Sequence, residues 1–214
     1  ETPTILEQRD RAYQLRLAMA TSHHSKLVLE GGFVEQVDRF SNDASFTGTD
    51  VTDRIRFSAW KAGINWGVSR FNRRQYPTEG KSFGFSLNYF QGMERYTPGT
   101  TSLQEENRVS FREWVQLRGR AEQYFPRGKF SWGYQVEGVL STQPFFANYQ
   151  ASLIYAPSAA PFADSRSLFL ERFRAHHYLF GGLRAIWSLT PRLDFRNEAA
   201  AFLPLWRITE ASPQ

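Results

Sequence analysis

The stretch that decides the fold is a run of strict alternation, Ser82-Phe83-Gly84-Phe85-Ser86-Leu87-Asn88-Tyr89. Large apolar side chains recur there at every second position, which is the period of a β-strand with two unlike faces. Turn residues and connections that alternate short and long separate further segments of this kind. The pattern predicts an all-β, antiparallel chain of about nine strands, near residues 11–20, 26–36, 54–69, 82–91, 108–122, 129–140, 149–156, 174–189 and 192–202.

Two of these segments depart from simple alternation. Ile55 and Phe57 occupy odd positions, whereas from position 60 onward the apolar residues occupy even ones. Because a one-residue slip moves every later side chain to the other face, we expect a bulge near Ser58–Trp60. In the segment 108–122, Glu113 falls on the apolar face and Trp114 on the polar face.

The composition excludes several classes of protein. The chain has 214 residues, no cysteine, 16% aromatic residues and a net charge of +5. A disulfide framework and a thiolate metal site are therefore excluded, and a mean hydropathy of −0.49 excludes a bundle of membrane helices. The arginines are spread along the whole chain, so we expect no nucleic-acid partner. No internal boundary is visible, and residues 1–214 are treated as one domain.

Alternating strands are compatible with a β-sandwich, a soluble lipocalin-like barrel and an outer-membrane barrel. Three features favour the membrane barrel. Several predicted strands run 11 to 16 residues, enough to cross a bilayer at a tilt. Aromatic residues gather at strand ends, and the polar faces carry arginine, glutamine and glutamate, which suits a lumen with internal ion pairs.

This interpretation assigns the two faces of the strands to two environments. The predicted lipid face carries large apolar side chains: Phe83, Phe85, Leu87, Phe111, Leu117, Trp132 and Val136. The predicted lumen face carries charged side chains: Arg112, Arg118, Arg120, Glu137 and Arg196.

Several longer motifs resemble a known family. They are Phe71-Asn72-Arg73-Arg74-Gln75-Tyr76-Pro77-Thr78-Glu79-Gly80, Gly92-Met93-Glu94-Arg95-Tyr96-Thr97-Pro98-Gly99, Ser141-Thr142-Gln143-Pro144-Phe145-Phe146-Ala147-Asn148-Tyr149 and Phe169-Leu170-Glu171-Arg172-Phe173-Arg174-Ala175. In order and spacing they resemble the C-terminal outer-membrane barrel of patatin-like phospholipase family proteins of Bacteroidetes-type bacteria. That barrel is similar to the bacterial surface-antigen superfamily.

The resemblance implies a sixteen-stranded barrel, of which about nine strands are an incomplete set. It implies a patatin hydrolase domain and a small periplasmic domain ahead of the barrel in the same parent protein. The turn with Pro77 and Gly80 would lie on the periplasmic side. The segment 156–174 would correspond to a loop that folds into the lumen and presents an arginine, for which Arg172 and Arg174 are the candidates.

The sequence carries no complete patatin catalytic pair and no recognisable metal-ligand pattern. A patatin hydrolase uses a serine in a Gly-x-Ser-x-Gly turn between a strand and a helix, and an aspartate followed by glycine. No aspartate of this chain is followed by glycine, and the one Gly-x-Ser-x-Gly match, Gly80–Gly84, runs into the alternating strand 82–89 with no helix pattern after it. His23-His24 and His176-His177 are adjacent pairs, which point to opposite faces of a strand and cannot chelate together. Glu105-Glu106 fits a solvated loop. We expect no enzymatic activity, no cofactor and no metal in this part of the protein.

The sequence therefore predicts a non-catalytic anchor or translocator-type barrel in a bacterial outer membrane. Its expected partners are membrane lipid, lipopolysaccharide, the missing strands and N-terminal domains of its parent, and an outer-membrane complex. Two alternatives stay open: a porin-like or transport barrel without a hydrolase, and a soluble lipocalin-like binder of apolar ligands.

Overall fold

The computed structural model describes residues 4–41, 47, 49–73, 76–100, 102, 106–147, 149–162, 165, 169–190 and 193–208. Within these residues the chain forms eight strands and two short helical elements. The strands are β1 (Thr4–Ser22), β2 (Ser25–Ser41), β3 (Asp53–Phe71), β4 (Gly80–Thr97), β5 (Arg108–Arg127), β6 (Phe130–Ser141), β7 (His177–Thr190) and β8 (Leu193–Trp206). The helix α1 (Tyr149–Tyr155) and the 3-10 turn η2 (Glu171–Phe173) lie between β6 and β7.

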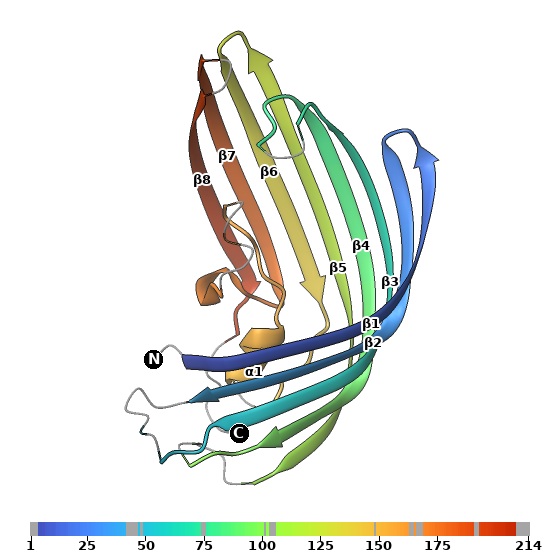
Figure 1. Cartoon of the computed structure of the whole chain (residues 1–214), viewed down its shortest axis with the longest axis vertical. Helices are drawn as coiled ribbons and strands as arrows, with labels where there is room; N and C mark the ends of the chain where they lie inside the picture. Colours follow the sequence, from blue (N-terminus) through green and yellow to red (C-terminus); the bar gives the residue numbers. More distant parts are fainter. Residues whose placement is uncertain are drawn as a thin grey trace.

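All eight strands belong to one antiparallel sheet, ordered β1 to β8 as in the chain. The predicted all-β antiparallel class is therefore confirmed. The sheet is strongly curved, and α1 lies in its hollow (Figure 1). We call the side that holds α1 the concave face and the opposite side the convex face. Because β1 and β8 are the two ends of the order, the sheet is open, and a closed sixteen-stranded barrel stays a prediction.

The predicted ninth strand, at residues 149–156, is wrong, because this segment forms the helix α1. Four consecutive residues of this helix, Ala151, Ser152, Leu153 and Ile154, are all buried. Ala151 and Ile154 pack against the strands β2 to β5, whereas Leu153 packs toward Ile208 after β8. A helix covered on several sides needs no polar stripe, so its sequence lacks the 3.6-residue period that would have revealed it.

The central part of the convex face is apolar and exposed. One row of directly opposite residues crosses six strands on this face: Leu17, Leu29, Ile64, Leu87, Leu117 and Leu140. All seven side chains predicted to face lipid lie on the convex face, and Phe85, Phe111 and Val136 are about half exposed. The alternation of the sequence therefore corresponds to two faces of a sheet whose outer side is not covered by this chain.

The predicted bulge near Ser58–Trp60 is wrong. β3 pairs with β2 and with β4 in continuous register through this region. Ile55 and Phe57 lie on the concave face, where α1 covers them, whereas Trp60 lies on the convex face and is 66% exposed. Along β3 the apolar residues shift from odd to even positions because the strand first contributes apolar side chains to the concave face and then to the convex face. The hydrogen-bonded pairing with β2 and β4 therefore continues without an extra residue.

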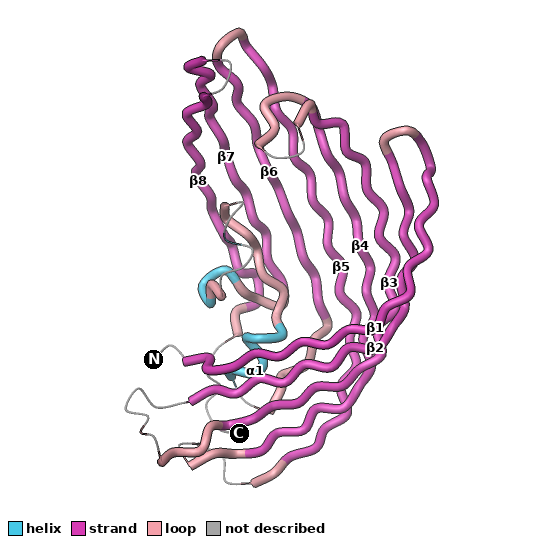
Figure 2. Tube along the Cα trace, viewed as in Figure 1, coloured by secondary structure: helices cyan, strands magenta, loops and turns pink. Residues whose placement is uncertain are grey.

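Connections of different length gather at the two ends of the sheet (Figure 2). Tight turns at residues 23–24 and 128–129 join β1 to β2 and β5 to β6, at the same end as the 72–79 turn. The longer connections from β2 to β3, from β4 to β5 and from β6 to β7 start at the other end. No helix in the described part of the chain is long and apolar enough to cross a membrane.

The turn that contains Pro77 and Gly80 is organised by Asn72. The Asn72 carboxamide oxygen accepts hydrogen bonds from the backbone N–H groups of Thr78 and Glu79, both at 3.2 Å. Gly80 has a φ of 103°, and a Cβ there would lie 1.9 Å from the carbonyl oxygen of Arg70. Only glycine fits this entry into β4. The periplasmic position of the turn stays a prediction.

Candidate functional site

The concave face holds the long connection between β6 and β7, residues 142–176, which we call the inserted segment. Its described parts run from β6 across the hollow and back to β7 (Figure 2). Phe146, Ala147, Ala151 and Ile154 pack against β2 to β5, whereas Ala159 and Ala175 pack against β6 and β7. The segment therefore connects both halves of the curved sheet. We call the apolar cluster that it forms with Phe40, Ile55, Phe57, Ala59, Tyr96 and Trp114 of β2 to β5 the cradle. The rest of the concave face carries charged side chains.

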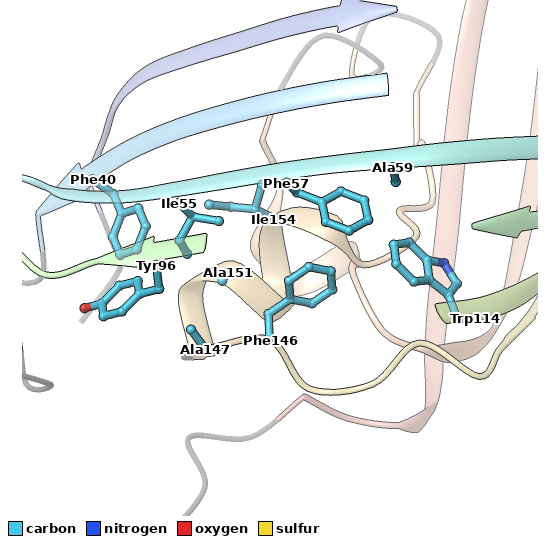
Figure 3. Close-up of a cluster of buried hydrophobic side chains, with 10 residues drawn as sticks. All are labelled: Phe40, Ile55, Phe57, Ala59, Tyr96, Trp114, Phe146, Ala147, Ala151 and Ile154. Atoms are coloured by element: carbon cyan, nitrogen blue, oxygen red, sulfur yellow. The ribbon is translucent and has the colours of Figure 1, made fainter. Parts of the chain in front are cut away.

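Aromatic side chains dominate the cradle (Figure 3). The Phe57 ring lies 5.5 Å from the Phe146 ring and 5.4 Å from the Tyr155 ring, measured between centroids. Trp114 stacks on Phe90 at 4.7 Å and meets Phe146 edge-on at 5.8 Å. Trp114 departs from the alternation because the inserted segment covers this part of the concave face. A side chain in contact with Phe146 is apolar here, although its neighbours on the same face of β5 are polar.

Two buried carboxylates of the sheet bind the inserted segment. Asp38 of β2 accepts a hydrogen bond from the Tyr155 hydroxyl at 3.0 Å. Glu94 of β4 accepts the backbone N–H of Ala147 at 2.6 Å and the Nε of Arg112 at 2.7 Å. Burial, together with the Asp38 carboxylate, raises the pKa of Tyr155 well above its ordinary value, so the phenol stays a donor.

Arg174 links the end of the inserted segment to the helix α1 in the same segment. Its guanidinium donates hydrogen bonds to the carbonyl oxygens of Leu153, Ile154 and Ala156, at 3.2, 2.7 and 3.3 Å. Burial lowers its pKa to about 10, so it is charged at neutral pH. Arg172, the other predicted candidate, is exposed. Of the two arginines, Arg174 is the one that is partly buried, and it satisfies carbonyls at the C-terminal end of α1.

The predicted lumen residues Arg118 and Glu137 face each other beneath the inserted segment. Their closest charged atoms are 3.9 Å apart, and Glu137 also accepts the Tyr178 hydroxyl at 2.6 Å. Arg118 donates to the carbonyl oxygen of Ser158 at 3.3 Å. A hollow of about 340 Å³ lies beside these groups and Arg120. The inserted segment therefore leaves polar space against the sheet on this side.

A larger ion network covers β5 to β8. Arg196 donates to Glu198 at 2.6 Å, Arg120 donates to Glu122 at 2.9 Å, and Arg184 contacts both carboxylates. Arg184 is the central cation of this network, and the sequence pattern did not single it out. Its segment, near residues 174–189, has two similar faces, so alternation alone could not assign its side. The network gives each carboxylate more than one cationic neighbour.

Tyr124 extends this network toward the tight-turn end of the sheet. Its hydroxyl donates to Glu122 at 2.7 Å and accepts from Arg196 at 2.8 Å. The ring lies over Gly133 of β6, where a Cβ would come within 2.5 Å of the ring. All five predicted lumen residues thus lie on the concave face and all carry ionic partners.

The remaining sequence candidates do not assemble into a site. His23 and His24 occupy the tight turn after β1, and Glu105 lies outside the described residues. His177 accepts the backbone N–H of Ser141 at 3.2 Å, while burial and the neighbouring His177 lower the pKa of His176. In the described ranges, no group of three or more histidine, cysteine or acidic side chains could hold a metal ion.

Comparison with protein-family models, with curated proteins and with solved structures finds no match to this chain.

Proposed function

We propose that this chain is part of an outer-membrane β-barrel that anchors its parent protein and has the inserted segment in its lumen. The observation that carries the proposal is the distribution of polarity over the curved sheet. Side chains such as Leu15, Leu183 and Leu140 are exposed on the convex face, at 82%, 62% and 52%. Arginine–carboxylate networks lie on the concave face. This is the reverse of a soluble barrel, whose apolar side chains point inward.

The extent of the apolar surface supports lipid as its environment. A soluble monomer rarely exposes a continuous apolar patch of more than a few hundred Å². Here the row from Leu17 to Leu140 crosses six strands, and rows on both sides of it are also apolar. The strands are 12 to 20 residues long, whereas crossing a bilayer at a tilt takes about 10. They are long enough to cross and extend beyond the membrane.

The inserted segment favours an anchor over an open pore. It is held by apolar packing, by two buried carboxylates and by Arg118, so passage of a large solute would require it to move. The edges of β1 and β8 are open, so closure of the barrel requires additional strands. The resemblance to patatin-like barrels implies that these strands belong to the same parent protein. A hydrolase domain in that parent is part of this proposal, whereas the porin-like alternative has none.

Membrane fractionation and the need for detergent distinguish an outer-membrane barrel from a soluble lipocalin-like binder. The whole gene product is expressed in a Gram-negative host, and its membranes are fractionated. We expect it in the outer-membrane fraction, with a band on an SDS gel that shifts on boiling, as stable barrels show. A folded, monodisperse protein in water without detergent would refute the membrane proposal.

A further inference from the structure

The convex face carries a group of arginines at its long-connection end, on strands β1 to β4. We call it the arginine belt: Arg9, Arg11, Arg39, Arg54, Arg56 and Arg95. All six are exposed, and the cross-strand register places them on the same face as the apolar rows. None of them was assigned a role by the sequence pattern.

The belt has more cations than its own carboxylates can neutralise. Glu7 pairs with Arg39 at 2.9 Å, and Glu35 is shared by Arg11, at 3.5 Å, and Arg56. In the part of the chain that the structure describes, neither Arg54 nor Arg95 has an ion pair with a carboxylate. Six guanidinium groups therefore meet two carboxylates on this surface.

The register also places like charges opposite each other. Arg56 of β3 lies directly across from Arg95 of β4, and Arg39 of β2 lies directly across from Arg54 of β3. Side chains at such positions start about 5 Å apart, and like charges there destabilise a sheet. An anion that accepts hydrogen bonds from both guanidinium groups removes this repulsion, and a phosphate has the oxygens to do so.

The belt lies at the height of lipid headgroups. Eight residues separate Ile64, in the central leucine row, from Arg56, which is about 19 Å along the membrane normal for a strand tilted by about 45°. Half of the apolar band of an outer-membrane barrel is about 12 Å. Trp60, which packs edge-on against Phe33 at 5.6 Å, lies between them at about 10 Å, where aromatic girdles occur.

We infer that the arginine belt binds the phosphate groups of the outer-leaflet glycolipid, lipopolysaccharide. This rests on the proposed function. Long connections of outer-membrane barrels face the cell exterior and tight turns face the periplasm, so the belt lies in the outer leaflet. There the lipid phosphates provide anions for Arg54 and Arg95, which have no carboxylate partner among the described residues, and for Arg56, which shares Glu35 with Arg11.

The chain offers a matched control for this inference. Arg70 and Lys81 lie directly opposite each other on the same two strands, β3 and β4, at the other end of the convex face. The test measures retention of diphosphoryl lipid A by native mass spectrometry on the whole gene product in micelles. Wild type is compared with Arg56→Gln/Arg95→Gln and with Arg70→Gln/Lys81→Gln.

We expect the belt variant to lose about thirtyfold in apparent affinity, because each arginine near an anionic membrane surface contributes about fivefold. The control variant should bind like wild type, and dephosphorylated lipid A should bind wild type weakly. Equal binding by the belt variant, equal loss in the control, or equal binding of dephosphorylated lipid would each overturn the inference. Displacement by millimolar inorganic phosphate would overturn the assignment to lipid.

A second belt variant keeps the test independent of folding. Arg9→Gln/Arg54→Gln leaves the ion pair of Arg56 with Glu35 intact and must also weaken binding. Heat-dependent gel mobility of each protein reports whether the barrel has folded. A folded barrel without phosphate-dependent binding overturns this inference alone, whereas failure of the wild type to fold in micelles overturns the proposed function as well.

Discussion

Replacing Leu117 by arginine tests the assignment of the two faces most directly. Leu117 lies on the convex face of β5, directly opposite Leu87 of β4 and Leu140 of β6. On the same face of β5, Phe111 lies six residues before it and Phe125 eight residues after it. In the proposed outer-membrane barrel, with strands tilted by about 45°, these rings would be about 14 and 19 Å away along the membrane normal, so that Leu117 would lie close to the bilayer midplane.

The neighbouring residue provides the control. Gln116 lies on the concave face, opposite Asn88 and Ser141. Gln116→Arg adds the same charge to the same strand, one position away, but within the polar interior. An arginine on the lipid face at the midplane costs about 2–4 kcal/mol. Leu117→Arg should therefore lower the ratio of folded to unfolded barrel by about thirtyfold to a thousandfold, because about 1.4 kcal/mol corresponds to a factor of ten.

Two measurements check this prediction. Urea titration of the barrel in lipid vesicles gives the change in the free energy of unfolding. Heat-dependent gel mobility of outer-membrane fractions gives the amount of assembled protein in cells. We expect strong loss for Leu117→Arg and little change for Gln116→Arg. Equal effects of the two substitutions would refute the assignment of the convex face to lipid and the concave face to the lumen.

Three further predictions concern the inserted segment. Phe57→Ala should destabilise the barrel by about 3–5 kcal/mol, because it leaves a cavity in the cradle. Phe85→Ala on the convex face should cost less in the same urea titration, since lipid fills the space. Arg174→Gln removes the charged donor from three carbonyls and should speed amide exchange in the inserted segment, while a rate equal to wild type would count against this role. Because the pKa of His176 is lowered on folding, stability should be full above about pH 6.5, the unfolded value, and decrease as the pH falls toward the folded value. His176→Gln should remove this dependence, and an unchanged pH profile of segment exchange would contradict it.

Alternation located the eight strands well, because each strand lies between two unlike environments along most of its length. The prediction failed where this contrast disappears. The helix α1 is buried on several sides, so Tyr149–Tyr155 carries no helical stripe, and the alternation of its residues predicts a strand. Ile55, Phe57 and Trp114 were irregular in the pattern because the inserted segment makes part of the concave face apolar.

The site was only partly accessible from the sequence. Arg118, Arg120 and Arg196 could be placed on the polar face because alternation in their strands is clear. Arg184 could not, since both faces of its strand contain apolar residues. The bond between Tyr155 and Asp38 joins residues 117 positions apart. No local pattern encodes such a contact, because it depends on how far the sheet curves around the segment.

The sequence by itself determined the class of the fold and the two-faced character of its strands, since a period of two follows from backbone geometry alone. The tertiary structure decided which face is which. An apolar face can point into a core or out into lipid with the same alternation, and only the curvature of the sheet distinguishes them. The curvature puts the arginine–carboxylate networks inside, leaves the leucine row outside and places the arginine belt beyond its edge. It also gives the inserted segment the hollow into which it packs.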